Sequence, residues 1–154
     1  MWHQDRPLRW TDFKGKPQPA LGFVASTNSG ISFSYSYKIN NGVRSTQFEV
    51  DSFFYPFESW YLRGEVNAYI LKHEQTHFDI SELHARKLRK RLDAANFTDN
   101  LKQEVEAIYH GIEQERKAMQ DTFDLESDHS KDEEGEAQWE EYVAEQLELY
   151  DRWK

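Results

Sequence analysis

The sequence predicts an α+β domain in which a small antiparallel sheet packs on one long helix, with two further helices behind it. All four prolines lie at or before Pro56, and five of the seven glycines lie at or before Gly64. Turns are therefore concentrated in the first part of the chain. Residues 21–54 are rich in strand-forming side chains, whereas the chain after residue 65 follows helical spacing without a proline.

Length, charge and cysteine content limit the possible functions. A chain of 154 residues suits a single domain, residues 1–154. The net charge is −9, and residues 99–154 carry 18 acidic against 6 basic side chains, which argues against a nucleic-acid partner. The chain has no cysteine, which excludes a disulfide scaffold and a cysteine nucleophile. It also contains no apolar run long enough for a membrane span.

The first part of the chain predicts an irregular arm followed by three strands. Residues 1–20 combine proline, glycine and large aromatic side chains, which is typical of an arm laid over a core. Strands are expected at residues 21–27, 31–39 and 43–54. Asn41 and Gly42 separate the last two strands and predict a tight hairpin, because both residue types accept the positive φ of a type I′ turn.

Three helices are expected after the strands. The first begins near Glu65 and runs for about 25 to 30 residues, ending near residues 93–96. Thr98 is the expected N-cap of a second helix over residues 99–119. A polar link, residues 121–135, leads to a last helix over residues 136–150.

The first helix carries the sequence His73-Glu74-Gln75-Thr76-His77, an HExxH motif. Two histidines four residues apart share one helix face, where they can bind one Zn²⁺. Glu74 lies about 100° around the helix from His73, beside the metal, where it can act as a general base toward a water that zinc activates. We therefore expect a zinc-dependent metallopeptidase with a peptide or protein substrate, with Glu74 as its catalytic base.

The third zinc ligand is open at this point. A metzincin would need Gly at position 80 and His at 83, but Ile80 and Leu83 stand there, so that class is excluded. His84 would lie about 16 Å further along a straight helix, which is too far for the same ion, so we expect it to be structural. The remaining candidates lie beyond residue 98: His110, Glu113, Asp124 and His129.

Several segments resemble the bacterial domain-of-unknown-function family 922. These are LRWTDFKGKP at 8–17, ASTNSGI at 25–31, HEQTHFDI at 73–80 and FDLESDH at 123–129. The resemblance implies a zincin-like, zinc-dependent protease in a secreted or periplasmic setting, with the cytoplasm as the alternative. It also implies that His129 is the third ligand, with Asp124 supporting or replacing it.

Two further expectations concern the surroundings of the site. Phe123 stands where the family has a tyrosine, so a hydroxyl donor to the substrate would have to come from elsewhere, for example from Tyr109. Asp79 could support a ligand histidine or serve as an alternative ligand. The competing functional hypothesis is a binding or assembly module without turnover, whose metal site is structural and takes all four ligands from the protein.

Overall fold

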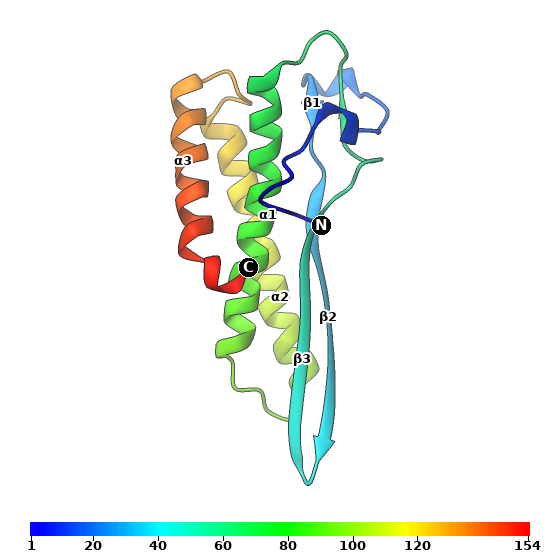
Figure 1. Cartoon of the computed structure of the whole chain (residues 1–154), viewed down its shortest axis with the longest axis vertical. Helices are drawn as coiled ribbons and strands as arrows, with labels where there is room; N and C mark the ends of the chain where they lie inside the picture. The colour runs from blue at the N-terminus through cyan, green and yellow to red at the C-terminus, as the bar shows by residue number, and fades with distance from the viewer.

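A computed structural model describes all 154 residues and confirms the α+β class. The three helices are α1 (Ala68–Ala94), α2 (Leu101–Glu126) and α3 (Glu133–Leu149). Helix α1 is central, with the long hairpin on one side and α3 on the other, while α2 lies behind α1 and also packs on the hairpin (Figure 1). The HExxH helix is therefore covered by other elements on most of its circumference. None of the helices combines the length and the apolar character that a membrane crossing requires.

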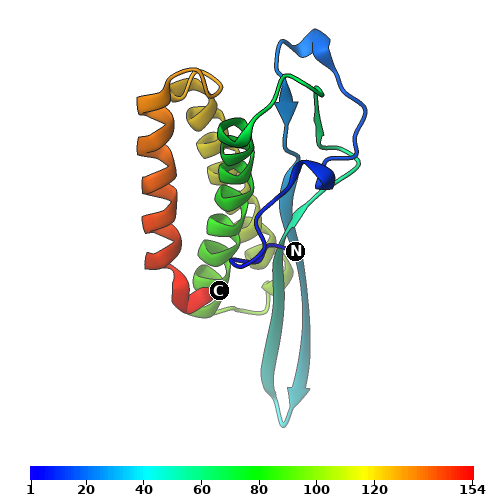
Figure 2. The same ribbon diagram turned by 45° about the horizontal axis from the view of Figure 1, so that its top comes forward.

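The strands form two separate two-stranded antiparallel sheets. Strands β2 (Ser29–Asn40) and β3 (Val43–Phe54) make the hairpin, and β1 (Ala25–Ser26) pairs with β4 (Trp60–Tyr61). Asn41 and Gly42 have φ of 50° and 76°, which confirms the predicted turn. Figure 2 shows the far half of the hairpin projecting beyond the helices, and only the near half supplies buried core residues such as Ile31 and Val50.

The N-terminal arm is irregular, as predicted, apart from short 3₁₀ turns at Trp10–Asp12 and Pro19–Leu21. It is fixed to the HExxH segment of α1 by side-chain hydrogen bonds. The Trp2 indole donates to Asp79 at 2.7 Å, and the Leu8 backbone N–H donates to Gln75 at 2.7 Å. Leu8 also packs with Phe78 in a small apolar cluster. The arm therefore supports the motif from the side away from α2.

Strand and helix boundaries differ from the prediction at several places. The expected strand at residues 21–27 shrinks to β1 because Gly22 takes a left-handed φ of 80° after a 3₁₀ turn. Helix α1 begins after Asn67, whose side chain accepts from the Ile70 N–H, and not at Glu65. Helix α2 begins after Asn100, because the Thr98 hydroxyl donates to Glu104 and does not cap the helix. Strand β4 was not predicted.

The polar link predicted for residues 121–135 is much shorter in the structure. Helix α2 continues to Glu126, because no breaker interrupts it and Phe123 is fully buried against α1 and α3. Helix α3 begins after Asp132, whose carboxylate accepts from the N–H groups of Glu134 and Gly135. The loop is therefore confined to residues 127–132, and Asp124 lies on a helix.

Candidate metal centre

The two motif histidines face each other on one side of α1, as the helical spacing predicts. His73 Nε2 and His77 Nε2 are 3.2 Å apart. His73 is buried, and His77 is nearly so. Both nitrogens point toward the last turns of α2, where Asp124 lies.

Asp124 completes a triangle of possible metal ligands. Its Oδ1 lies 3.3 Å from His73 Nε2 and 3.0 Å from His77 Nε2. Zinc bonds of about 2.0 to 2.1 Å at the tetrahedral angle put neighbouring ligand atoms about 3.3 to 3.4 Å apart. The three observed separations are close to that value, and two imidazoles with one carboxylate are a donor set that zinc accepts. The residues therefore fit the metal that the motif implies.

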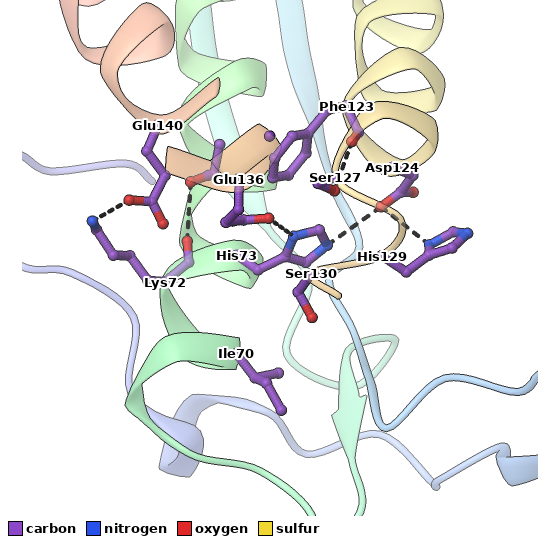
Figure 3. A network of polar contacts seen from close by, with 12 residues as sticks. Ile70, Lys72, His73, Phe123, Asp124, Ser127, His129, Ser130, Glu136 and Glu140 are labelled. Atoms are coloured by element: carbon purple, nitrogen blue, oxygen red, sulfur yellow. Dashed lines mark hydrogen bonds and ion pairs between the residues drawn. The ribbon is translucent and has the colours of Figure 1, made fainter. Parts of the chain in front are cut away.

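Each imidazole is oriented through its other nitrogen. His73 Nδ1 donates to the buried carboxylate of Glu136 at 2.8 Å (Figure 3). His77 Nδ1 donates to the side-chain oxygen of Gln120, whose amide also donates back to the His77 carbonyl at 2.8 Å. These bonds leave both Nε2 atoms free for a metal, since the hydrogen bond at one nitrogen fixes the tautomer.

Glu136 and Gln120 were both missed at the level of sequence. Gln120 stands four residues before Asp124, so it shares a helix face with the ligand, but the prediction ended α2 at residue 119. Glu136 belonged to an acidic run that looked like a solvated surface. Only the early start of α3 brings this carboxylate inward, where it is 1% exposed.

Phe123 forms the apolar wall behind the two imidazoles. Its ring centroid lies 4.6 Å from that of His73 and 4.9 Å from that of His77, and the ring is fully buried. A side chain packed on both rings restricts their rotation. Phe123 has no hydroxyl to offer a substrate. The alternative donor Tyr109 lies elsewhere, stacked on Phe33 with its hydroxyl toward the Ile31 carbonyl.

Glu74 is buried beside the triangle, and its Oε2 has no hydrogen-bond partner in the protein. An unpartnered buried carboxylate oxygen is costly unless a ligand or a water satisfies it. Its helix turn is held in place by the Thr27 hydroxyl, which donates to the Glu74 carbonyl at 3.2 Å. Glu74 lines the same cavity as the triangle, and its role as a general base stays a prediction.

Without a metal, the two histidines of the triangle bind protons more tightly than a free histidine does. Burial opposes the charge on His73, but its hydrogen bonds to Asp124 and Glu136 outweigh burial and raise its pKa to about 9. Burial also opposes the charge on His77, and the hydrogen bond to Asp124 reverses this, so the pKa of His77 is raised as well. Burial disfavours the charged form of Asp124, but the two histidines hold its pKa well below the usual range. A bound cation would replace these protons.

The triangle opens into a cavity of about 430 Å³. Residues 22–27, which include β1, lie along one part of its wall, and His73, Glu74 and His77 lie along another. Asp124 and the loop residues 129–131 complete the wall near the metal ligands. The candidate centre is thus accessible from solvent on one side and packed against Phe123 on the other.

Of the proposed third ligands, the structure brings only Asp124 into the group of ligand atoms that lie within 4.8 Å of one another. His129 lies next to it, with Nδ1 3.4 Å from Asp124 Oδ1, and lines the same cavity. His110 is exposed on α2, and Glu113 forms an ion pair with Arg116 at 2.9 Å.

Two other singled-out residues have structural contacts. His84 is buried, as expected for a structural residue; it bonds to the Ile80 carbonyl at 2.8 Å, and burial lowers its pKa to about 4. Asp79 contacts neither a ligand histidine nor the metal triangle through a hydrogen bond. It accepts from Trp2 and Gln75 instead, and burial raises its pKa to about 6 despite those bonds.

Comparisons with known proteins agree with the family resemblance. No curated protein and no solved structure matched the chain. A family model matches residues 9–130, a span that includes His73, Glu74, His77, Asp124 and His129 and ends before α3. The chain therefore belongs to the family described as "Bacterial protein of unknown function (DUF922)".

Proposed function

We propose that this protein is a zinc-dependent metallopeptidase whose zinc is held by His73, His77 and Asp124. The observation that carries the proposal is the triangle of their ligand atoms, with separations of 3.0, 3.2 and 3.3 Å. Asp124 replaces His129 as the third ligand in this assignment. The support from Glu136 and Gln120 at the two Nδ1 atoms agrees with it, because metal-binding histidines usually donate that proton to a carboxylate or a carbonyl.

The chemistry divides between the metal and Glu74. Bound zinc would act as a Lewis acid that polarises the scissile carbonyl and acidifies water. Glu74 takes a proton from the attacking water as the new C–O bond forms at the carbonyl carbon. It then delivers that proton to the amide nitrogen as the C–N bond breaks, so that the products are a carboxylic acid and an amine. The unpartnered Oε2 of Glu74 is available for this proton.

A peptide in extended conformation suits the cavity. Strand β1 is paired with β4 on one edge only, and residues 22–27 line the cavity that holds the triangle. An unpaired strand edge binds an extended peptide through main-chain hydrogen bonds. The proposed substrate is therefore a peptide or an unfolded protein segment that lies beside β1 with its scissile bond near Glu74.

The competing hypothesis, a structural metal site in a binding module, is less well supported. A structural zinc site takes four ligands from the protein, whereas a catalytic site takes three and keeps one position open. Only three donors form the group here, and a cavity adjoins them. This arrangement favours turnover.

Metal analysis together with Glu74→Gln tests the proposal. Protein purified without chelator is expected to hold one zinc per chain, measured by atomic emission, and to cleave fluorescein-labelled casein. Glu74→Gln should keep its zinc but lose roughly 10²-fold or more of that activity, because the base is gone. Glu106→Gln, on the exposed face of α2, is the matched control and should behave as wild type. A protein without zinc, or an equally active Glu74→Gln variant, would refute the function.

A further inference from the structure

The loop between α2 and α3 has an unusual backbone next to the candidate metal centre. Three consecutive residues that are not glycine, Asp128, His129 and Ser130, have positive φ angles of 44°, 50° and 69°. Left-handed conformation costs an L-residue roughly 1 to 2 kcal/mol, so a run of three persists only where other contacts enforce it. The loop is therefore held in a specific shape.

Hydrogen bonds at both ends of the loop enforce this shape. The His129 backbone N–H donates to the Asp124 carbonyl at 2.9 Å, and the Asp132 N–H donates to the Ser127 carbonyl at 2.9 Å. The Tyr69 hydroxyl, from the first turn of α1, donates to the Ser130 carbonyl at 2.8 Å. The loop is thus tied to both ligand-bearing helices, and His129 is fixed relative to them.

The His129 side chain stands beside the ligand triangle without belonging to it. Its Nδ1 is 3.4 Å from Asp124 Oδ1, and its ring lies 4.6 Å from the ring of Phe23, another residue of the cavity wall. Figure 3 shows the imidazole next to Asp124, on the side away from His73. The side chain is 41% exposed, and no other polar side chain bonds to it. Its imidazole is therefore available to a molecule in the cavity.

We propose that His129 is a catalytic residue that donates a hydrogen bond to the scissile carbonyl oxygen as that oxygen gains negative charge, and that it is not a zinc ligand. Asp124 would then have two roles, as a metal ligand and as the carboxylate that orients His129 through Nδ1. With Nδ1 beside Asp124, Nε2 is the ring nitrogen that would donate to the substrate. This inference rests on the proposed function.

The other candidates for this role are less suitable. Phe123 has no donor, and the Tyr109 hydroxyl lies in a different cluster beside Ile31. The Tyr69 hydroxyl already donates to the Ser130 carbonyl, which makes Tyr69 a positioning residue for the loop. Three histidines line the cavity wall, and two of them, His73 and His77, belong to the triangle. His129 is the third, and its ring makes no hydrogen bond to a backbone group.

Variants at positions 129, 124 and 110 separate a donor from a ligand. His129→Ala should keep one zinc per chain and, with Co²⁺ in place of zinc, the wild-type visible absorption spectrum. Its kcat on fluorescein-labelled casein should fall about 10²- to 10³-fold, which is typical of a lost oxyanion donor, with KM within about threefold of wild type. His129→Gln, which keeps an N–H donor, should recover part of kcat.

Asp124→Ala should lose zinc, and His110→Ala, an exposed histidine on α2, should match wild type in every measurement. Loss of zinc in His129→Ala would make His129 a ligand and overturn the inference while leaving the proposed function intact. An unchanged kcat in His129→Ala would overturn it too. A wild-type protein that binds no zinc or cleaves no casein would overturn the proposed function, and this inference with it.

Discussion

The two motif histidines, His73 and His77, differ in the group that accepts a hydrogen bond from Nδ1. His73 donates to the carboxylate of Glu136, and His77 donates to the amide oxygen of Gln120. A carboxylate makes the imidazole a stronger ligand than an amide does, because it stabilises the positive charge that the ring acquires. The second oxygen of Glu136, Oε1, is buried without a partner, so this carboxylate is kept inside the protein mainly by its bond to His73.

Replacing Glu136 by Gln should therefore weaken zinc binding without removing the site. The amide oxygen can still accept from His73 Nδ1, but the negative charge is lost. We expect the Kd for zinc to rise about 10- to 100-fold, measured by competition with a chromophoric chelator. Glu140→Gln is a matched control, because Glu140 lies one turn further along α3 and pairs with the exposed Lys72. Equal zinc affinity in the two variants would contradict the role given to Glu136.

At the scale of elements, hydrophobic and turn patterns predict those helices and turns that depend on local sequence. The hairpin at Asn41 and Gly42 and the position of the HExxH helix follow from turn preference and helical spacing, and both are confirmed. The end of α2 and the start of α3 depend on the burial of Phe123 and on the Asp132 cap in a folded chain. The burial of Phe123 is a tertiary contact without a periodic signal, so the helical location of Asp124 could not be predicted. The Asp132 cap is local, but it does not reveal that Glu136 points inward to His73.

Gly135 is the element-scale test of how α2 and α3 meet. A Cβ at this position would lie 2.5 Å from the Glu126 carbonyl oxygen, which is backbone and has little freedom to move. We expect Gly135→Ala to destabilise the fold by about 1 to 3 kcal/mol, as overpacking does, and to weaken zinc binding because Asp124 and Glu136 flank the contact. Chemical denaturation and zinc titration measure the two effects.

Gly111→Ala provides the matched control for that substitution. Gly111 lies inside α2, and a Cβ added there would have no neighbouring atom within 4 Å, so alanine should stabilise the helix by about 0.5 to 1 kcal/mol. The two substitutions, Gly135→Ala and Gly111→Ala, should therefore change the free energy of unfolding in opposite directions. A Gly135→Ala variant as stable as wild type would mean that the α2–α3 contact is looser than described.

At the scale of the whole molecule, the site joins three helices, although the matched family span covers only two of them. The proposed metal ligands come from α1 and α2, whereas Glu136 comes from α3, beyond residue 130. The acidic C-terminal third of the chain is thus not only a solvated surface. One of its carboxylates, Asp124, lies beside both motif histidines, and another, Glu136, orients His73.

Zinc binding should release protons. The pKa of His73 is raised to about 9, and that of His77 is raised too. The zinc-free site is therefore protonated at pH 7, and zinc must displace about one proton or more when it binds. Zinc affinity should rise with pH from 6 toward 9. Calorimetric titration at pH 7 in two buffers of different ionisation enthalpy measures the release, and identical heats in both buffers would contradict it.

The zinc-free protein should show the opposite trend with pH. A pKa raised above the unfolded value of 6.5 stabilises the fold fully below pH 6.5, and this contribution is lost as pH rises through about 9. Thermal unfolding with and without zinc across this range is the corresponding measurement. Melting temperatures that rise in parallel for both forms would be inconsistent with protonated histidines in the empty triangle.

The separation of the ligands along the chain gives the metal a further property. His77 and Asp124 are 47 residues apart, so an unfolded chain that gathers all three ligands must close a long loop. The chain entropy of that closure costs about 4 kcal/mol, nearly a thousandfold in affinity. An unfolded chain offers zinc little more than the local histidine pair. Zinc would therefore distinguish chains in which α2 has docked on α1 from those in which it has not, and its uptake would report the completion of folding.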